Sequence, residues 1–399
     1  MGSNPAWGTI VTHSPFGMFF YFRHYNKQIV NGVFMNEYLS ADASSNEFLI
    51  TPNIPADLQW GVTFGFYAKN GYFSSKKAYD EVEAMVAAGV TWVTVVVTVW
   101  QDSCHSTFQY RDFVHTPNDI ELMEIIDFIH SKGMKVQLRP MLETKDGYGR
   151  LHITFPKKGG TRIPGRHSDA RELWFASMKE RSVYYGSIAE RTGCEIFCLD
   201  SELDAMTEEN ALWLEVVNAV RKVYSGPITS CHTLHTGKVD FLKSLSKPNH
   251  WFYALDFLSI SYYCPARTEA DAGVELSVED MALRLNEAHT KMKAISDAMG
   301  RPILFGECGC SSNVGSARSP SSMSPFVEID EEEQARYMEA LFRVFAKEDW
   351  CLGFHWWKWD QHVDPQPGAT KESTRASDFT IKGKKSENVF KNWATTVRR

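Results

Sequence analysis

The sequence from Val90 to Trp100 reads VTWVTVVVTVW. Each of its residues is β-branched or aromatic, and both kinds of side chain favour β-strands. The run does not alternate between apolar and charged positions, as a strand with one wet face would. It therefore predicts a strand of a parallel sheet that is covered on both faces.

Outward from this run, the chain repeats one pattern of strand followed by amphipathic helix. Ser74 and Ser75 are typical starts for a helix over Lys76 to Ala88, and Thr116-Pro117 precedes another helical stretch. Eight such units predict a (β/α)8 barrel, an α/β fold, over residues 60–399. The eight predicted strands are Trp60 to Tyr67, Val90 to Trp100, Met134 to Pro140, Cys194 to Asp200, Pro227 to Cys231, Leu255 to Tyr263, Pro302 to Glu307 and Cys351 to Trp357.

Residues 1–59 fall outside this repeat. They are rich in aromatic side chains and carry turn signals such as Asn31-Gly32. We interpret them as a β-rich or irregular N-terminal extension packed on the barrel.

Composition excludes several classes of function. The chain is 43% hydrophobic and 23% charged, as in ordinary globular proteins, and its net charge is -7. Basic tracts interleaved with aromatics are missing, so no nucleic-acid partner is expected. No apolar run reaches membrane length, and the first residues do not form a signal peptide, which predicts a cytoplasmic protein without a membrane partner. Met1-Gly2-Ser3 also fits a cloning remnant, which leaves a removed signal peptide as the alternative, and a homo-oligomer remains open.

Two glutamates end predicted strands. Glu202 follows the fourth strand and Glu307 closes the seventh. In a β/α barrel the active site lies at the C-terminal ends of the strands, and strands four and seven lie across the ring from each other. Two carboxyl groups that converge in this way suit glycosidic bond cleavage, where one donates a proton and the other attacks the anomeric carbon. We predict that Glu202 is the acid/base and Glu307 the nucleophile.

The arrangement resembles clan A of the glycoside hydrolases, in which these glutamates follow strands 4 and 7. Short motifs are similar to glycoside hydrolase family 113, known for β-mannanases. The motifs are Trp100-Gln101, Asp200-Ser201-Glu202-Leu203, Gly306-Glu307-Cys308-Gly309 and Gly353-Phe354-His355-Trp356-Trp357. The resemblance implies retaining hydrolysis of β-1,4-mannan or manno-oligosaccharides without a cofactor. A β-glucan-directed or exo-acting enzyme of the same clan is the alternative.

The resemblance also implies supporting roles. Many clan members have Asn before the acid/base residue, whereas this chain has Ser201, which puts the contact to the substrate 2-hydroxyl in doubt. Tyr262, at the end of the sixth strand, is expected to donate a hydrogen bond to Glu307. Arg139, at the end of the third, is expected to place positive charge beside it, unless it forms a structural salt bridge.

Other residues at strand ends are candidates for substrate binding. Tryptophan rings pack on the C–H faces of sugars, so Trp100, Trp356 and Trp357 are candidates. Trp356 is favoured for the cleft because it shares a face of the strand with Phe354 and Leu352. Gln101, His232 and His235 are the polar candidates.

Two rival classes remain. His232 and His235 fit one part of a metal site, but the first strand offers no further His pair, so no metal is predicted. A sugar-binding barrel without catalysis would keep the tryptophans, yet the presence of both glutamates argues against it.

Overall fold

The structure is a computed structural model that describes residues 50–155 and 169–397. Within these residues eight parallel strands close into a barrel in the order β1 to β8. This confirms the predicted (β/α)8 fold. The strands are β1 (Gln59–Phe64), β2 (Trp92–Gln101), β3 (Lys135–Thr144), β4 (Ile196–Ser201), β5 (Ile228–Thr233), β6 (Leu258–Tyr262), β7 (Ile303–Cys308) and β8 (Cys351–Trp356).

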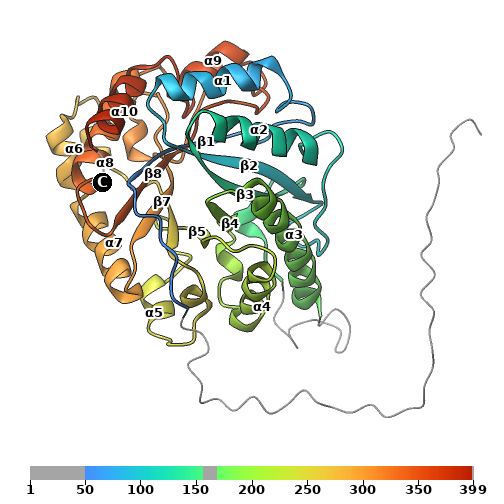
Figure 1. The fold of residues 1–399 in the computed structure, drawn as a ribbon. Coiled ribbons are helices and arrows are strands. Elements are labelled where there is room, and N and C mark those ends of the chain that lie inside the picture. The colour runs from blue at the N-terminus through green and yellow to red at the C-terminus, as the bar shows by residue number, and fades with distance from the viewer. Residues whose placement is uncertain (1–49, 156–168, 398–399) are drawn as a thin grey trace, which may run out of the picture. The chain divides into compact units, whose positions relative to one another are not determined.

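Helices surround the strands, as Figure 1 shows. They are α1 (Lys76–Ala87), α2 (Asp119–Ser131), α3 (Ala170–Thr192), α4 (Asn210–Arg221), α5 (Phe241–Leu245), α6 (Val278–Arg284), α7 (Asn286–Met299), α8 (Glu331–Phe345), α9 (Lys371–Ser377) and α10 (Lys385–Thr396). Short 3-10 turns are η1 (Arg150–His152), η2 (Asp204–Met206), η3 (Trp251–Ala254), η4 (Glu269–Asp271) and η5 (Ser316–Arg318).

Helix starts follow local chemistry. Ser75 caps α1 by accepting a hydrogen bond from the Ala78 amide. The start of α2 is capped by Asn118, which forms a capping box with Glu121, rather than by the preceding Thr116. Each cap satisfies amides that the first helical turn leaves without partners.

The barrel interior is filled in layers. Near the N-terminal ends of the strands, a buried apolar cluster draws on strands around the ring, including Trp92, Ile196, Leu304 and Leu352. Near the other end lies a second cluster that includes Phe66, Tyr263 and Trp357. The interior is therefore a packed core and not a pore.

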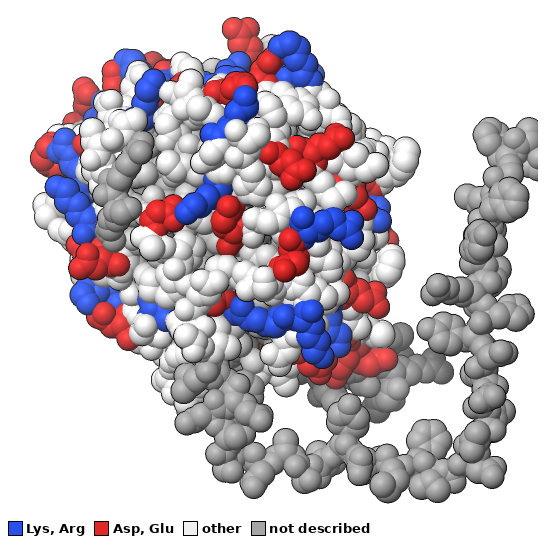
Figure 2. Space-filling view, in the orientation of Figure 1, with Lys and Arg blue, Asp and Glu red and all other residues white. Residues whose placement is uncertain are grey.

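Part of the sequence prediction lies outside the described residues. This holds for residues 1–49 of the predicted N-terminal extension. Among the described helices, none is both long enough and apolar enough to cross a membrane. Acidic and basic side chains are interspersed over the face shown in Figure 2.

Candidate active site

Glu307 lies near the end of β7 and is almost fully buried. Its Oε1 accepts hydrogen bonds from Arg139 Nη1 at 2.9 Å and from Ser201 Oγ at 2.6 Å. The Tyr263 hydroxyl lies 3.5 Å from its Oε2. Both Oε1 donors stand on neighbouring strands, β3 and β4, so the barrel itself fixes this carboxyl group.

A glycine makes room for the arginine. The other guanidinium nitrogen, Arg139 Nη2, donates to the Gly306 carbonyl oxygen at 2.9 Å. A Cβ at Gly306 would lie 2.8 Å from Ser259 Cβ and 3.2 Å from Arg139 Nη2. A larger residue at this position would therefore push the guanidinium away from Glu307.

Opposing effects set the ionisation of Glu307. Burial and the nearby Glu202 raise its pKa, while Arg139, Arg150 and the Ser201 hydroxyl lower it. The net direction is upward, because burial is the largest of these effects. The three lowering groups all favour the ionised carboxylate that a nucleophile must present.

Glu202 follows β4 and has different partners. Its Oε1 accepts from Ser261 Oγ on β6 at 2.5 Å, and its Oε2 accepts from Arg150 Nη2 at 2.9 Å. Its φ angle is 62°. Apart from Glu202, the only described non-glycine residue with positive φ is Tyr67, which also borders the site. Such conformations are costly and cluster at functional sites.

Arg150 connects the acidic groups of the site. It stands on η1, after β3, and forms a second ion pair with Glu143 through Nη1. Its guanidinium carbon lies 5.8 Å from the centre of the Phe66 ring. Burial and the proximity of Asp200 and Glu202 raise the pKa of Glu143, whereas Arg150 lowers it. Sequence reasoning missed Arg150 because nothing in a loop sequence shows which side chain turns back into the cleft.

Aromatic side chains form a continuous wall beside the carboxyl groups. Trp357 lies 4.7 Å from Phe66 between ring centres, and Phe66 lies 4.1 Å from Tyr67. Tyr67 is stacked on Trp100 at 5.6 Å and an interplanar angle of 27°. Two of the three predicted tryptophans, Trp100 and Trp357, belong to this wall.

The predicted hydrogen bond from Tyr262 to Glu307 is wrong, because the adjacent Tyr263 is the tyrosine that lies beside Glu307. Tyr262 faces the helices and packs on Phe305 and Phe345, with ring centres 5.1 and 5.4 Å away. Tyr263 faces the cleft on the same side of the chain as Ser261, which bonds Glu202. The alternation of β6 contained the signal, because Ser261 and Tyr263 are two positions apart.

The choice of Trp356 for the cleft was also wrong. Its indole Nε1 donates to the Phe379 carbonyl oxygen, and the ring is fully buried in the core. Alternation along β8 breaks at Gly353, where φ is 132° and a Cβ would lie 2.2 Å from the Gln59 carbonyl oxygen. Leu352 therefore faces into the barrel, while Phe354 packs outward on Phe342 of α8.

Alternation failed on β7 as well. Regular alternation would put Ile303 and Phe305 on the same face as Glu307, yet both pack in the large outer core, while Leu304 faces the interior. The pairing of β6 with β7 shifts between Ser259 and Ser261, so an extra β7 residue turns Glu307 inward.

Two polar candidates lie away from the cleft. Gln101 is buried, with its Oε1 accepting from Trp174 Nε1 on α3 and its Nε2 donating to the Ser103 carbonyl oxygen. His232 is buried against Trp251 and Phe252, with its Nδ1 3.2 Å from Asp204 Oδ1. Both side chains turn outward from their strands, which sequence position alone does not reveal.

His235 is the polar candidate that stays near the site. Its ring meets Tyr263 edge-on at 5.8 Å. Burial lowers its pKa, and the nearby Glu202 and Asp204 act in the opposite direction. Among the described residues, no group of three or more His, Cys, Asp or Glu side chains could hold a metal ion.

The barrel and its facing pair of buried glutamates define a glycoside hydrolase. The chain belongs to glycoside hydrolase family 113, whose family model matches residues 62–384. The resemblance seen in the sequence motifs is thus confirmed for the family.

Solved structures agree with this assignment. A family 113 β-1,4-mannanase, solved as a complex, is 28% identical with a TM-score of 0.70, and the match covers 85% of this chain and 99% of that one. The β-mannanase of Alicyclobacillus acidocaldarius, in complex with ManMIm, is 25% identical with a TM-score of 0.69 over 85% and 97% of the two chains. A family 5 mannosidase of Rhizomucor miehei, 10% identical with a TM-score of 0.54 over 85% and 92%, shares the fold. No curated protein matches the chain.

Proposed function

We propose that this glycoside hydrolase cleaves β-1,4-mannan or manno-oligosaccharides with retention of configuration. The observation that carries the mechanism is the contrast between the two carboxyl groups. Glu307 accepts hydrogen bonds from a buried guanidinium and a hydroxyl that are both fixed on strands. Glu202 accepts from a serine and from an arginine on a loop turn.

In the first step Glu307 attacks the anomeric carbon and forms a glycosyl ester as the glycosidic bond breaks. Glu202 gives its proton to the departing oxygen. In the second step Glu202 takes a proton from water, which attacks the same carbon and releases Glu307 as a carboxylate. Arg139 and Ser201 stabilise Glu307 whenever it is ionised.

Arg150 suits the proton cycle of Glu202. It binds Glu143 and Glu202 through different nitrogens, so its charge stays paired with Glu143 when Glu202 is protonated. Protonated Glu202 can still accept the hydrogen bond from Ser261 Oγ at Oε1, since a protonated carboxyl group retains acceptor capacity. Glu143 thus acts as a counterion that holds Arg150 in place through both steps.

The aromatic wall supplies the binding surface. The flat faces of Trp357 and Trp100 can pack against the C–H groups of pyranose rings. Mannan is the proposed substrate because the two family 113 structures compared above are of β-mannanases. The wall itself selects for sugar rings in general and leaves the choice of sugar to the polar residues of the cleft.

A glycan panel tests the proposal. It contains β-1,4-mannan, manno-oligosaccharides, β-1,3- and β-1,4-glucans and aryl β-mannosides and β-glucosides, with chelator present and absent. We expect reducing ends from mannan in both conditions. Preference for glucans would contradict the proposed substrate, and lack of hydrolysis with intact sugar binding would indicate a barrel without catalysis.

A further inference from the structure

A groove outside the catalytic centre is lined by basic side chains. It consists of two cavities, of about 330 Å³ and about 200 Å³. They share four lining residues, Gln361, Val363, Asp364 and Thr374, and are therefore contiguous. We call them together the cationic groove.

Four exposed cations line the outer cavity. Lys69 comes from the loop before α1, Lys77 from the first turn of α1, and Lys371 and Arg375 from α9. The two helices lie side by side at the top of Figure 1. Among the described residues, none of these four side chains has an ion-pair or hydrogen-bond partner. Asp364 is the one carboxylate among the residues that line the groove.

A fifth cation lines the inner cavity, next to the active site. Lys358 is only 4% exposed, and its Nζ has one hydrogen bond, to Gln361 Oε1 at 2.8 Å. The same Nζ lies 5.8 Å from the ring centres of both Phe66 and Trp357. An ammonium group has three donors, so two remain for a ligand.

The groove adjoins the catalytic centre through Phe66. Arg150, which binds Glu202, lies against the Phe66 ring, and Lys358 lies against the same ring. Phe66 and Trp357 line the inner cavity and also form part of the aromatic wall. A carbohydrate bound at the wall can therefore extend into the groove.

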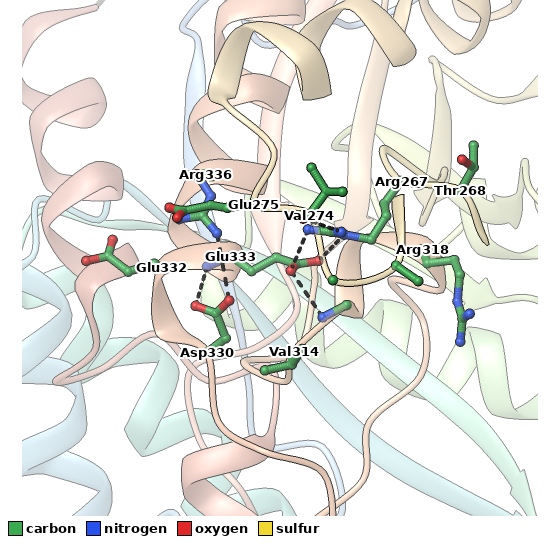
Figure 3. Close-up of a pocket in the computed structure, with 13 residues that line it drawn as sticks. Arg267, Thr268, Val274, Glu275, Val314, Arg318, Asp330, Glu332, Glu333 and Arg336 are labelled. Atoms are coloured by element: carbon green, nitrogen blue, oxygen red, sulfur yellow. Dashed lines mark hydrogen bonds and ion pairs between the residues drawn. The ribbon is translucent and has the colours of Figure 1, made fainter. Parts of the chain in front are cut away.

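A larger cavity elsewhere gives the contrast. It measures about 560 Å³ and is lined by Arg267, Arg318 and Arg336. Figure 3 shows how acidic residues meet two of these arginines: Arg267 pairs with Glu333, and Arg336 pairs with Glu275 and Asp330. Arg318 pairs with Glu269. The three arginines of this larger cavity are already ion-paired, whereas none of the four exposed cations of the cationic groove forms an ion pair within the described residues.

We propose that the cationic groove binds an anionic substituent, a carboxylate or a phosphate, on the carbohydrate whose scissile bond lies at Glu202 and Glu307. The inference rests on the proposed function for the sugar in the cleft and adds a preference for chains of that sugar that carry an acidic or phosphorylated substituent. Lys358 recognises the substituent at the inner end of the groove. The four exposed cations attract it and hold it at the outer end.

Binding of monosaccharide probes tests the inference. Calorimetric titrations compare D-glucuronate, mannose 6-phosphate and mannose at one ionic strength. We expect at least one of the two anionic sugars to bind at least about tenfold more tightly than mannose, which corresponds to about 1.4 kcal/mol. The carboxylate and phosphate arms show which anion fits. Added salt should weaken the binding of the anionic sugars but not that of mannose, because salt screens exposed charges.

The site variant combines Lys69→Gln, Lys77→Gln, Lys371→Gln and Arg375→Gln. Its matched control, Lys222→Gln, Lys291→Gln, Lys347→Gln and Lys391→Gln, removes four exposed charges outside the groove. We expect the preference for anions to be lost in the site variant and kept in the control. Lys358→Met is a third variant, and its thermal midpoint shows whether it folds.

Equal affinity for mannose and both anionic sugars in the wild type would overturn the inference. So would an equal loss in the site variant and the control, because net charge alone would then explain binding. Hydrolysis of mannan is measured separately. Anion binding without any hydrolysis of β-mannosides would contradict the proposed function and leave this inference standing.

Discussion

The two glutamates at the mouth of the barrel differ in what holds them. Glu307 is bound by donors on β3 and β4, which cannot move without disturbing the sheet. Glu202 is bound by Ser261 on β6 and by Arg150, which stands on a short turn in a loop. A carboxylate that must stay ionised is thus held by the rigid part of the fold. A carboxyl group that must gain and lose a proton has a partner on a loop turn, and the charge of that partner stays paired with Glu143.

Removing the nucleophile should have the largest effect. We expect Glu307→Gln to lower kcat by at least about 10⁴-fold on every substrate, because no other group among the described residues is assigned to form the covalent bond. The measurement is kcat on mannan and on an aryl β-mannoside, with the thermal midpoint as a control for folding. A folded variant that keeps more than about one per cent of its activity on both substrates would break the comparison.

Removing the acid should have a smaller effect that depends on the leaving group. We expect Glu202→Ala to slow mannan hydrolysis by about 10² to 10⁴-fold and to slow cleavage of activated aryl mannosides much less, since these hardly need protonation. Azide should restore part of the lost rate on the aryl substrate. Equal losses on both substrates would mean that Glu202 is not the acid.

The acidic limb of the pH profile should report Glu307. Its pKa is raised by burial, so kcat/KM should fall as the pH falls through a value above that of an ordinary glutamate. The Ser201 hydroxyl lowers this pKa, so Ser201→Ala should move the limb to higher pH, by less than about one unit. Ser259→Ala is the matched control, because Ser259 Oγ lies beside Thr229 Oγ1. A limb that stays in place or moves down in Ser201→Ala would contradict the assignment.

The smallest effect distinguishes the adjacent tyrosines. We expect Tyr263→Phe to reduce kcat several-fold, because its hydroxyl lies at the long limit of a hydrogen bond to Glu307. Tyr262→Phe, with its hydroxyl turned to the helices, should leave the pH profile unchanged. If the two variants exchange behaviours, the inward orientation of Tyr263 is wrong.

The sequence was sufficient for the barrel and for the position of both glutamates. Runs such as VTWVTVVVTVW specify a doubly covered strand whatever their neighbours, and strand ends lie together in any parallel barrel. Side-chain direction was less predictable, because alternation holds only in a regular strand. Gly353 and the shifted pairing at Glu307 break it on two strands.

The contacts made by loop residues could not be predicted from the sequence for a different reason. Arg150 lies six positions after the end of β3, and its return to Glu202 depends on tertiary packing. The predicted substrate-binding roles of Gln101 and His232 were wrong for a similar reason. Gln101 binds Trp174, which lies far along the chain, and His232 binds Asp204, which lies in a turn. Residue type and strand position indicate a candidate, whereas contact requires the folded structure.

Trapping the covalent intermediate tests the central claim most directly. A 2-deoxy-2-fluoro β-mannoside with a good leaving group slows both steps, and the leaving group keeps the first step fast enough for the glycosyl ester to accumulate. We expect the intact protein to gain the mass of one fluorosugar and peptide mapping to place it on Glu307, with β-configured product released first from ordinary substrates. A label on Glu143 or Asp204, or early release of the α anomer, would contradict the account.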